Sequence, residues 1–413
     1  MDMEQKDLSK TTVKKGSRPM IFVLYWAMRL YYALMGVRID AVNKWGTLPE
    51  APAIILCNHG SFIDFIFAAS LLWRDLPHFV VARLYFYHRL LGWALRKIGC
   101  FPKSMFAFDA ESTKNCLRVL KNGERLAMMP EARLSTVGRF EDIQASTYSF
   151  LKKAGVGVYT VKLHGDYFAD PKWGKGVRRG SVIQAELDIL FTPEQLRELS
   201  VEEIQKGVEE RLYYDEFCWL ETQPNIRYRS RRLAEGLENI LTLCPVCGAH
   251  CTVTTRGCDI MCTSCGTKTI LDERYQLAPG FGFENFGQWF HWQKEQMRQK
   301  ILQDEKFTLT SQVELRLPGD GWSLTRHAGT GVCTLNREGL CYCGTRDGRP
   351  YEVRFSIQRI YRLLFGAGEN FEIYNGTEIL YFVPAVKQSS VDWYIASMLL
   401  NDMAREESLF LTE

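Results

Sequence analysis

Two Cys-x-x-Cys pairs constrain the fold of this 413-residue chain more than any other feature. Cys244 and Cys247 form the first pair, and Cys262 and Cys265 form the second, with 14 residues between the pairs and a glycine directly after each. Four thiolates with this spacing suit a tetrahedral Zn²⁺ ion, and four protein ligands leave no open coordination position. The pattern therefore predicts a structural zinc ion in a small ribbon over residues 240–272.

Other residues of this island leave alternatives open. His250, Cys251 and Cys258 lie between the pairs and offer substitute ligands with poorer spacing. Zinc ribbons often bind nucleic acid or protein, but the local cations are few (Arg256 and Lys268) and no aromatic ladder for bases accompanies them. We expect the ribbon to stabilise the chain as a clip or to dock a protein partner.

The overall composition excludes several classes of protein. Hydrophobic residues make up 46% of the chain and charged residues 24%, which supplies buried cores and excludes a mainly disordered or fibrous protein. The formal net charge is only +3, so we expect no nucleic-acid partner. The 13 cysteines do not fit a small secreted disulfide scaffold and are typical of thiols kept reduced in a cytosol.

The region before the ribbon alternates short apolar runs with helical patterns. Residues 53–57 and 156–163 predict buried strands, and residues 112–122 predict a helix that ends at Gly123. Alternation of this kind is typical of an α/β fold with a mainly parallel sheet and flanking helices. We assign this domain to residues 46–235.

The region after the ribbon has a different pattern. Residues 273–306 predict a helical linker, and residues 307–413 predict strands followed by one helix, with a type I′ hairpin at Asn375-Gly376. This β-rich pattern resembles pleckstrin-homology-like or GRAM-like domains, which bind phosphoinositides, lipids or peptides. Basic residues cluster in one part of this region, but they do not indicate a particular ligand. They are Arg346, Arg349, Arg354, Arg359 and Arg362.

Residues 1–45 combine a basic tail with an apolar, aromatic segment over residues 20–37. Arg29 lies in the middle of that segment, and a charge at mid-bilayer depth costs at least about 2.5 kcal/mol. We therefore expect a helix in the membrane interface, with a spanning helix and a buried core helix as the alternatives. The aromatic side chains expected at headgroup level are Tyr25, Trp26, Tyr31 and Tyr32.

A second segment, residues 79–101, also favours contact with anionic headgroups. Its cations lie among apolar and aromatic residues: Arg83, His88, Arg89, Arg96 and Lys97. An ordinary core helix with a solvated cationic face is the alternative for this segment.

The chemistry of the first domain centres on the end of strand 53–57. The chain continues directly into Asn58, His59, Gly60 and Ser61, and α/β sheets place active sites at strand ends. If Ser61 caps the next helix, Asp64 falls at its third position and returns toward His59. A carboxylate on one ring nitrogen leaves the other to accept a proton. The alternative is a plain capping box formed by Ser61 and Asp64.

Two later blocks carry candidate anion ligands. Lys103 ends the block 99–103, and Arg133 lies within the block 130–135. Arginine offers phosphate a bidentate fork, and lysine offers a point charge.

Taken in order, these blocks resemble the glycerolipid acyltransferases of the 1-acylglycerol-3-phosphate (lysophospholipid) type. The family signature is Asn-His-x-Ser-x-x-Asp, Gly-x-x-x-Arg/Lys, Pro-Glu-Gly-x-Arg-Ser and an apolar strand. These elements correspond to residues 58–64, 99–103, 130–135 and 155–162, and the resemblance covers residues 20–230.

The resemblance implies a transferase that moves a fatty acyl group from acyl-CoA or acyl-ACP to a lysophospholipid hydroxyl, such as that of lysophosphatidic acid. It implies that His59 is the general base and that Asp64 orients it. Implied substrate-binding residues are Lys103, Glu131, Arg133, Asn58 and Ser61, and the Gly60 and Ser61 amides would stabilise developing negative charge. The enzyme would be peripheral or monotopic on the cytoplasmic face of a membrane.

The chain departs from the family pattern at several positions. Ala132 replaces the usual glycine, Lys103 stands where many members have arginine, and the fourth block lacks its proline. If position 132 requires a positive φ, alanine strains the loop. The alternative function is a non-catalytic protein that binds lipid and recruits a partner through the ribbon or the C-terminal domain.

Overall fold

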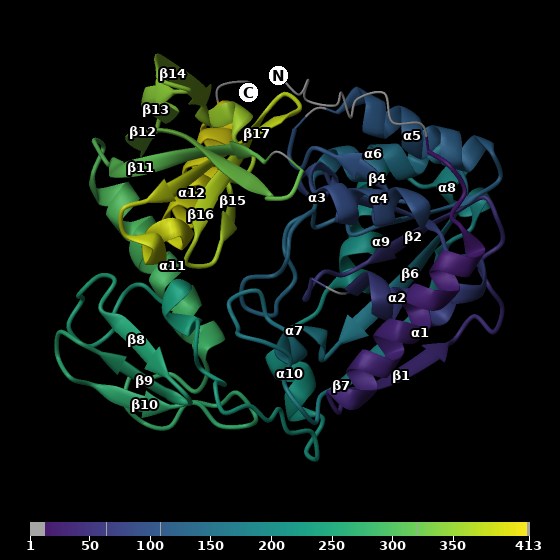
Figure 1. Ribbon diagram of the computed structural model, residues 1–413, viewed down its shortest axis with the longest axis horizontal. Coiled ribbons are helices and arrows are strands. Elements are labelled where there is room, and N and C mark those ends of the chain that lie inside the picture. Colours follow the sequence, from purple (N-terminus) through teal and green to yellow (C-terminus); the bar gives the residue numbers. More distant parts are fainter. Residues whose placement is uncertain (1–12, 63, 108, 320, 411–413) are drawn as a thin grey trace. The chain divides into compact units, whose positions relative to one another are not determined.

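The computed structural model describes residues 13–62, 64–107, 109–319 and 321–410 (Figure 1). The chain divides into two compact units. The first comprises Met1–Lys172 and Gly176–Ser230, and the second comprises Trp173–Lys175 and Arg231–Glu413. The first part of the predicted basic tail, with Lys6 and Lys10, lies outside the described residues.

The first unit is built on a seven-stranded sheet of order β1-β7-β6-β2-β5-β3-β4. Its strands are β1 (Arg38–Asn43), β2 (Ala53–Cys57), β3 (His78–Ala82), β4 (Phe101–Lys103), β5 (Arg125–Met128), β6 (Gly157–His164) and β7 (Val182–Phe191). Five of them, β2 to β6, are mutually parallel, whereas β7 pairs with β6 in antiparallel orientation. The predicted mainly parallel α/β sheet is confirmed.

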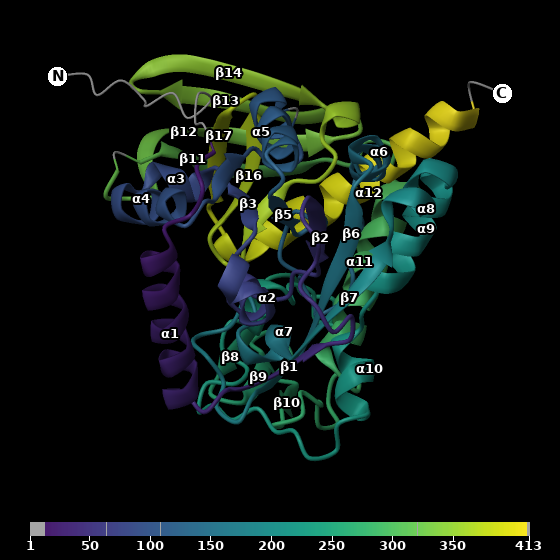
Figure 2. The ribbon, with the colours of Figure 1, turned by 90° about the vertical axis from the view of Figure 1, so that its right-hand side faces the viewer.

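Helices cover both faces of this sheet. They are α1 (Arg18–Leu34), α2 (Asp64–Leu72), α3 (Leu84–Tyr87), α4 (Arg89–Lys97), α5 (Ala110–Lys121), α6 (Ala145–Ala154), α7 (Asp166–Ala169), α8 (Pro193–Glu198), α9 (Val201–Leu212) and α10 (Glu216–Glu221). α5, α6 and α9 bury apolar side chains against Ile54 and Leu56 of β2. Figure 2 shows α1 and α9 on opposite sides of the sheet.

The helix predicted over residues 112–122 is α5, and the chain leaves it at Gly123 with a φ of 71°. The side chain of Asp109 accepts a hydrogen bond from the Ser112 amide and so caps its first turn. The second oxygen of Asp109 accepts from the buried Arg83 guanidinium at 2.9 Å. Arg83 is therefore an internal ion-pair partner, and its predicted contact with headgroups is wrong. The segment 79–101 forms β3, α3 and α4 rather than one helix.

The apolar segment predicted over residues 20–37 forms α1. Among its described side chains only Tyr32 is buried, where its ring contacts Phe67 at a centroid distance of 5.5 Å. Tyr32 is thus a packing residue, contrary to its predicted place among the headgroups, and α1 as a whole is not a core helix. Within the described residues, no helix is both long and apolar enough to cross a membrane.

The second unit begins with a three-stranded antiparallel ribbon of order β10-β9-β8. Its strands are β8 (Val253–Arg256), β9 (Asp259–Cys262) and β10 (Lys268–Ile270). Helix α11 (Phe286–Gln303) follows and packs against the chain that enters the ribbon. The fully buried Trp289 donates to the Leu243 carbonyl at 2.9 Å, and the Gln293 side chain accepts the Thr242 amide at 2.7 Å.

A seven-stranded antiparallel sheet of order β14-β13-β12-β11-β17-β16-β15 completes the unit. Its strands are β11 (Leu309–Pro318), β12 (Thr325–Asn336), β13 (Gly339–Arg346), β14 (Arg349–Ser356), β15 (Leu364–Gly366), β16 (Asn370–Asn375) and β17 (Glu378–Pro384). A hairpin joins β16 to β17 as predicted, but Asn375 pairs with Glu378, so the two loop residues are Gly376 and Thr377. Of these two only Gly376 has a positive φ, 65°, so the predicted type I′ turn, which needs a positive φ at both positions, is wrong. Helix α12 (Ser390–Phe410) follows. Trp393 of α12 stacks on Phe371 with ring centroids 4.3 Å apart.

Candidate active site and metal centre

The candidate active site lies where the neighbouring parallel strands β2 and β6 end. The chain leaves β2 through Asn58, whose side chain is fully buried. Its amide nitrogen donates to the Leu163 carbonyl at 2.9 Å, and its oxygen accepts from the Leu163 amide at 2.7 Å. Asn58 therefore fixes the start of the following loop against β6, and with it the position of His59.

His59 and Asp64 meet as the sequence predicts. The Nδ1 atom of His59 lies 2.9 Å from Oδ2 of Asp64, with side-chain exposures of 21% and 0%. The same carboxylate accepts from the Ser61 amide at 3.0 Å. Asp64 therefore accepts the Ser61 amide, as in a capping box, and contacts His59 at the same time. The two alternatives raised by the sequence do not exclude each other. Because Asp64 occupies Nδ1, Nε2 is the ring nitrogen left for proton exchange.

The Gly60 and Ser61 amides, which precede α2, were predicted to stabilise negative charge that develops on the substrate, but the structure gives them another partner. Both amides hydrogen-bond to the Asp64 carboxylate. They hold the carboxylate in place beside His59 instead of facing a substrate.

The block 130–135 clamps the backbone of His59 from both sides. The His59 amide donates to Oε1 of Glu131 at 3.1 Å, and the Ser135 amide donates to the His59 carbonyl at 2.8 Å. The other oxygen of Glu131 accepts from the Glu141 amide at 2.9 Å and from the Tyr214 hydroxyl at 3.2 Å. Glu131 is fully buried, and burial raises its pKa well above the ordinary value. Its contacts are those of a residue that positions His59.

The two predicted anion ligands lie in different places. Arg133 is nearly buried in the same block and forms an ion pair with Glu141. Lys103 ends β4, which is separated from β2 by β5 and β3. The structure thus gathers Asn58, Ser61, Asp64 and Glu131 around His59, keeps Arg133 on the adjoining loop, and places Lys103 further along the sheet.

Ala132 has a φ of 57°, in the left-handed region that favours glycine. For a residue with a Cβ atom this conformation costs about 1–2 kcal/mol. The departure from the family pattern at this position therefore carries the backbone strain that the sequence predicts.

Buried carboxyl groups surround the His59–Asp64 pair. Asp166 lies directly under Gly60, where a Cβ atom would overlap its carboxyl group, so a side chain at position 60 would displace Asp166. Burial and the neighbouring Asp64 carboxylate raise the pKa of Asp166 well above the ordinary value. Burial also raises the pKa of Asp64 and lowers the pKa of His59. The site thus disfavours added charge on either group, and burial favours the neutral form of His59 that a general base requires.

A second histidine–carboxylate pair, which was not predicted from the sequence, lies at the end of β6. Nδ1 of His164 lies 2.9 Å from Oε1 of Glu216, with side-chain exposures of 21% and 0%. The other oxygen of Glu216 accepts the Gly165 amide, and the His164 ring stacks on Trp219 at 5.5 Å. The strand-end rule applied to β6 could have found His164. No local pattern indicates Glu216, which lies 52 residues away.

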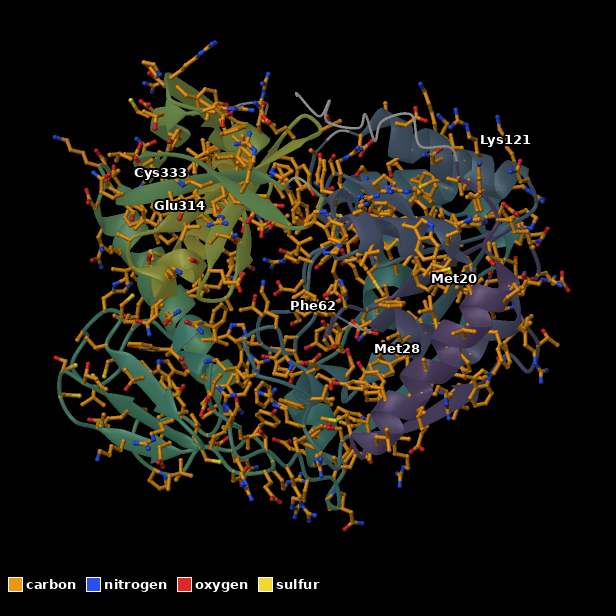
Figure 3. The ribbon with its side chains drawn as sticks, in the orientation of Figure 1. Met20, Met28, Phe62, Lys121, Glu314 and Cys333 are labelled. Carbon is orange, nitrogen blue, oxygen red and sulfur yellow. The ribbon has the colours of Figure 1, made fainter. Side chains whose placement is uncertain are left out.

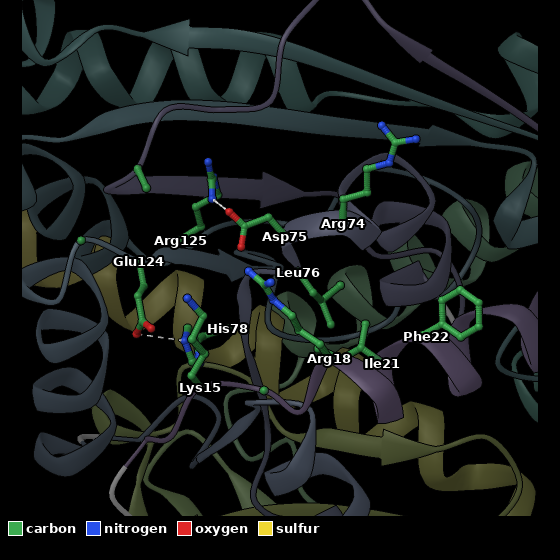
Figure 4. Close-up of a pocket in the computed structure, with 13 residues that line it drawn as sticks. Lys15, Arg18, Ile21, Phe22, Arg74, Asp75, Leu76, His78, Glu124 and Arg125 are labelled. Carbon is green, nitrogen blue, oxygen red and sulfur yellow. Dashed lines mark hydrogen bonds and ion pairs between the residues drawn. The ribbon is translucent and has the colours of Figure 1, made fainter.

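A cavity of about 440 Å³ lies at the opposite ends of the strands (Figure 4). It is lined by residues at the starts of β3 and β5, among them His78 and Arg125. His78 pairs with Glu124 at 3.1 Å, and Arg125 pairs with Asp75. Because His59 follows the other end of β2, this cavity is not part of the candidate active site.

The four predicted zinc ligands converge in the ribbon. The Sγ atoms of Cys244 and Cys265 lie 3.9 Å apart, and those of Cys247 and Cys262 lie 3.8 Å apart. A tetrahedral ion with metal–sulfur bonds of about 2.3 Å requires sulfur separations of about 3.8 Å. Backbone amides of each knuckle point at its first sulfur, from residues 246 and 247 and from residues 264 and 265. The four sulfur atoms can hold a metal ion.

Residues 39–164 match the family model described as Acyltransferase. This range runs from β1 to the end of β6 and contains His59 and His164, the histidines of the two histidine–carboxylate pairs. The chain therefore resembles the glycerolipid acyltransferases in the region that carries the candidate active site.

Among curated proteins, the chain is 26% identical over 156 residues to a chloroplastic 1-acyl-sn-glycerol-3-phosphate acyltransferase of Arabidopsis thaliana, covering 37% of this chain and 42% of the relative. It is 25% identical over 156 residues to the chloroplastic enzyme of the same description from Brassica napus, covering 37% and 44%. The chain thus spans less than half the length of these curated relatives.

Among solved structures, the chain is similar to the 1-acyl-sn-glycerophosphate acyltransferase of Thermotoga maritima. The TM-score is 0.38 and the identity 19%, with 46% of this chain and 76% of that chain covered.

Proposed function

We propose that the first unit transfers a fatty acyl group from a thioester, acyl-CoA or acyl-ACP, to a hydroxyl group of a lysophospholipid such as lysophosphatidic acid. The observation that carries the proposal is the His59–Asp64 pair, 2.9 Å apart, within the stretch that matches the Acyltransferase model. The two curated relatives bear names that specify this acceptor.

In the proposed reaction, Nε2 of His59 takes the proton of the acceptor hydroxyl group. At the same time the oxygen of that hydroxyl group attacks the thioester carbonyl carbon. The carbon–sulfur bond then breaks. The imidazolium of His59 gives its proton to the leaving thiolate, which departs as the free thiol. Asp64 keeps the proton on Nδ1 and stabilises the imidazolium that forms in between. No protein nucleophile is needed, because the acceptor oxygen attacks directly.

The surrounding residues have distinct roles in this proposal. Asn58, Ser61 and Glu131 position His59 and Asp64 through the hydrogen bonds described above. Arg133 and Lys103 supply positive charge for the acceptor phosphate, with Arg133 pre-oriented by Glu141.

We further propose that α1 and α4 rest on the cytoplasmic face of a membrane, from which the acceptor is drawn. The Ser17 amide at the start of α1 donates to the Lys97 carbonyl at the end of α4, so these ends adjoin. Both helices expose large apolar side chains: Phe22, Val23, Leu24, Trp26, Leu30, Tyr31, Leu34, Leu90, Leu91 and Trp93. Met20 and Met28 also lie along α1 (Figure 3). Amphipathic helices of this kind bury their apolar face at the headgroup boundary.

We also propose that the four-cysteine site holds zinc as a structural ion, because four thiolates at these separations are typical of structural zinc. Replacing the exposed Cys265 by serine would then release one zinc ion per chain, as measured by elemental analysis of the purified protein.

The test follows free thiol released from acyl-CoA in the presence of detergent-solubilised lysophosphatidic acid. The variant His59→Ala should lose about 10²- to 10⁴-fold in rate, the usual contribution of a general base. His327→Ala is the matched control, because Nδ1 of His327 also lies 3.0 Å from a carboxylate, that of Glu314, but on the exposed surface of the second unit.

The outcome separates the two functions considered. A rate that depends on His59 supports acyl transfer. Equal and negligible thiol release from wild type and His59→Ala, with both acyl-CoA and acyl-ACP as donors, would contradict it. That result would favour the non-catalytic lipid-binding protein.

A further inference from the structure

Three potential metal ligands meet in the second unit outside the four-cysteine site. Nε2 of His250 lies 2.9 Å from Oδ2 of Asp392, and Sγ of Cys251 lies 3.8 Å from the same Nε2. All three donor atoms lie within 4.8 Å of one another. His250 and Cys251 belong to the ribbon, whereas Asp392 belongs to the first turn of α12.

Neighbouring groups hold these side chains in place. The Thr242 hydroxyl donates to Oδ1 of Asp392 at 2.7 Å, which turns the other oxygen toward His250. The Cys251 amide donates to the Thr242 carbonyl at 2.6 Å. The Thr242 amide is in turn held by the side chain of Gln293 on α11. Hydrogen bonds of this kind, which orient a carboxylate ligand from behind, are typical of metal sites.

The backbone at Cys251 supports the same conclusion. Its φ is 53°, in the left-handed region, where a residue with a Cβ atom costs about 1–2 kcal/mol. This conformation places the thiol beside the His250 ring. Strained residues of this kind cluster at ligand-binding sites.

The donor set fits a particular ion. An imidazole nitrogen, a thiolate and a carboxylate oxygen are the three ligand types that Zn²⁺ uses in proteins. With bonds of about 2.0–2.3 Å, neighbouring ligand atoms of a tetrahedral ion lie about 3.3–3.6 Å apart. The nitrogen–oxygen separation of 2.9 Å is shorter than this and the sulfur–nitrogen separation of 3.8 Å is longer, so small side-chain movements would bring the three atoms around an ion. The His250 side chain is 54% exposed and that of Asp392 5%, so an ion can enter from solvent and be held from within.

We propose that His250, Cys251 and Asp392 bind a second Zn²⁺ ion. Its fourth position is open to a water molecule or an anionic ligand, unlike that of the four-cysteine site. The ion connects the ribbon to α12 across 142 residues of sequence. It therefore fastens two elements of the second unit to each other, whereas the first ion closes the ribbon on itself.

The test counts zinc in the full-length protein after saturation and exhaustive dialysis. We expect two ions per chain in wild type and one in both Asp392→Asn and Cys251→Ser. Cys258→Ser is the matched control, since this thiol lies in the same ribbon but belongs to neither ligand set, and it should retain two. Substitution with Co²⁺ gives a second readout, because Cys251→Ser should remove the thiolate-to-cobalt absorption of one site only.

One zinc ion in wild type, or two in both ligand variants, would overturn the proposal. Circular dichroism checks that each variant is folded, and His250→Gln, at the most exposed ligand, replaces any variant that is not. The readout does not involve acyl transfer. Failure of the second site therefore leaves the proposed function untouched, and failure of the proposed function leaves the site untouched.

Discussion

The two histidine–carboxylate pairs of the first unit have the same local geometry and different surroundings. In both, Nδ1 lies 2.9 Å from a fully buried carboxylate oxygen. His59, however, is clamped through its backbone by the block 130–135, while the His164 ring has one face covered by Trp219. Both carboxylates also accept backbone amides, Asp64 those of Gly60 and Ser61 and Glu216 that of Gly165. A histidine–carboxylate contact alone therefore does not identify a general base.

From this difference we propose separate tasks for the two pairs. The His59 pair is formed by residues five apart, and the loop around it orients the ring. The His164 pair joins the end of β6 to the start of α10, and we propose that it is a structural contact. Five measurements can break or sharpen this comparison.

The largest effect is expected for Asp64→Asn. An amide neither stabilises the imidazolium nor keeps the proton on Nδ1, so the rate of thioester consumption should fall by about 10²- to 10⁴-fold with the fold intact. Steady-state thiol release and circular dichroism measure the two quantities. A folded variant with near wild-type rate would remove Asp64 from the mechanism.

A smaller effect on rate is expected for Glu216→Gln. Because its carboxylate holds both His164 and the Gly165 amide, we expect a loss of about 1–3 kcal/mol in the free energy of unfolding and less than a tenfold loss in rate. Urea denaturation and thiol release test this. If the rate falls as far as in Asp64→Asn, the two pairs act together and the separate assignments are wrong.

The pH dependence of kcat/KM provides a third test. The His59–Asp64 pair must lose a proton to become a base, and burial raises the pKa of Asp64, so the pair retains that proton to higher pH. The rate should therefore rise with pH between pH 5 and pH 8, because burial raises the pKa of Asp64 from the ordinary carboxyl value to about 8. A flat profile between pH 5 and pH 8 would contradict this. In Glu216→Gln the rising limb should move to lower pH, because a nearby negative charge is removed.

Asp166→Asn should change the pH dependence of stability more than the rate. Since burial raises the pKa of Asp166, the folded state binds more protons than the unfolded state, and stability is lost as pH rises above the unfolded pKa. The asparagine variant, a neutral isostere, should equal wild type near pH 4 and exceed it at pH 8 in free energy of unfolding. Equal values at both pH values would show that Asp166 is not protonated in the folded protein.

The smallest effect is expected for Ala132→Gly, in the block that clamps His59. Glycine relieves the backbone strain at φ 57°, which stabilises the folded state, but its greater flexibility stabilises the unfolded chain. These two contributions to the free energy of unfolding nearly cancel. Thermal denaturation should show a change within about 1 kcal/mol, with an unchanged rate. A large gain in rate would show that alanine distorts the loop under His59.

Local patterns predicted much of this fold and site, and long-range pairing accounts for what they missed. The strand 53–57, the helix after Asp109 and the hairpin at Asn375 each depend on residues close in sequence. The His59–Asp64 contact was predictable for the same reason, because the first turn of α2 returns Asp64 to the chain that precedes it.

Contacts between distant segments left no sequence signal. Arg83 has the appearance of a surface cation until Asp109, 26 residues away, is known to neutralise it. Glu131 resembles a ligand-binding carboxylate, but three protein donors, including the Tyr214 hydroxyl 83 residues away, occupy it. Glu216 and Asp166 become part of the site only through the neighbouring ends of β2 and β6.

The side chain of Asn58 replaces one pair of backbone hydrogen bonds in the sheet. Its amide donates to the Leu163 carbonyl and accepts from the Leu163 N–H, as the backbone of a neighbouring strand would. Aspartate has the same shape but lacks the donor, and leucine has a similar volume but lacks both. The choice of amino acid here is therefore dictated by the continuity of the sheet, one position before the proposed base. An asparagine next to a reactive histidine can thus be indispensable without ever touching the substrate.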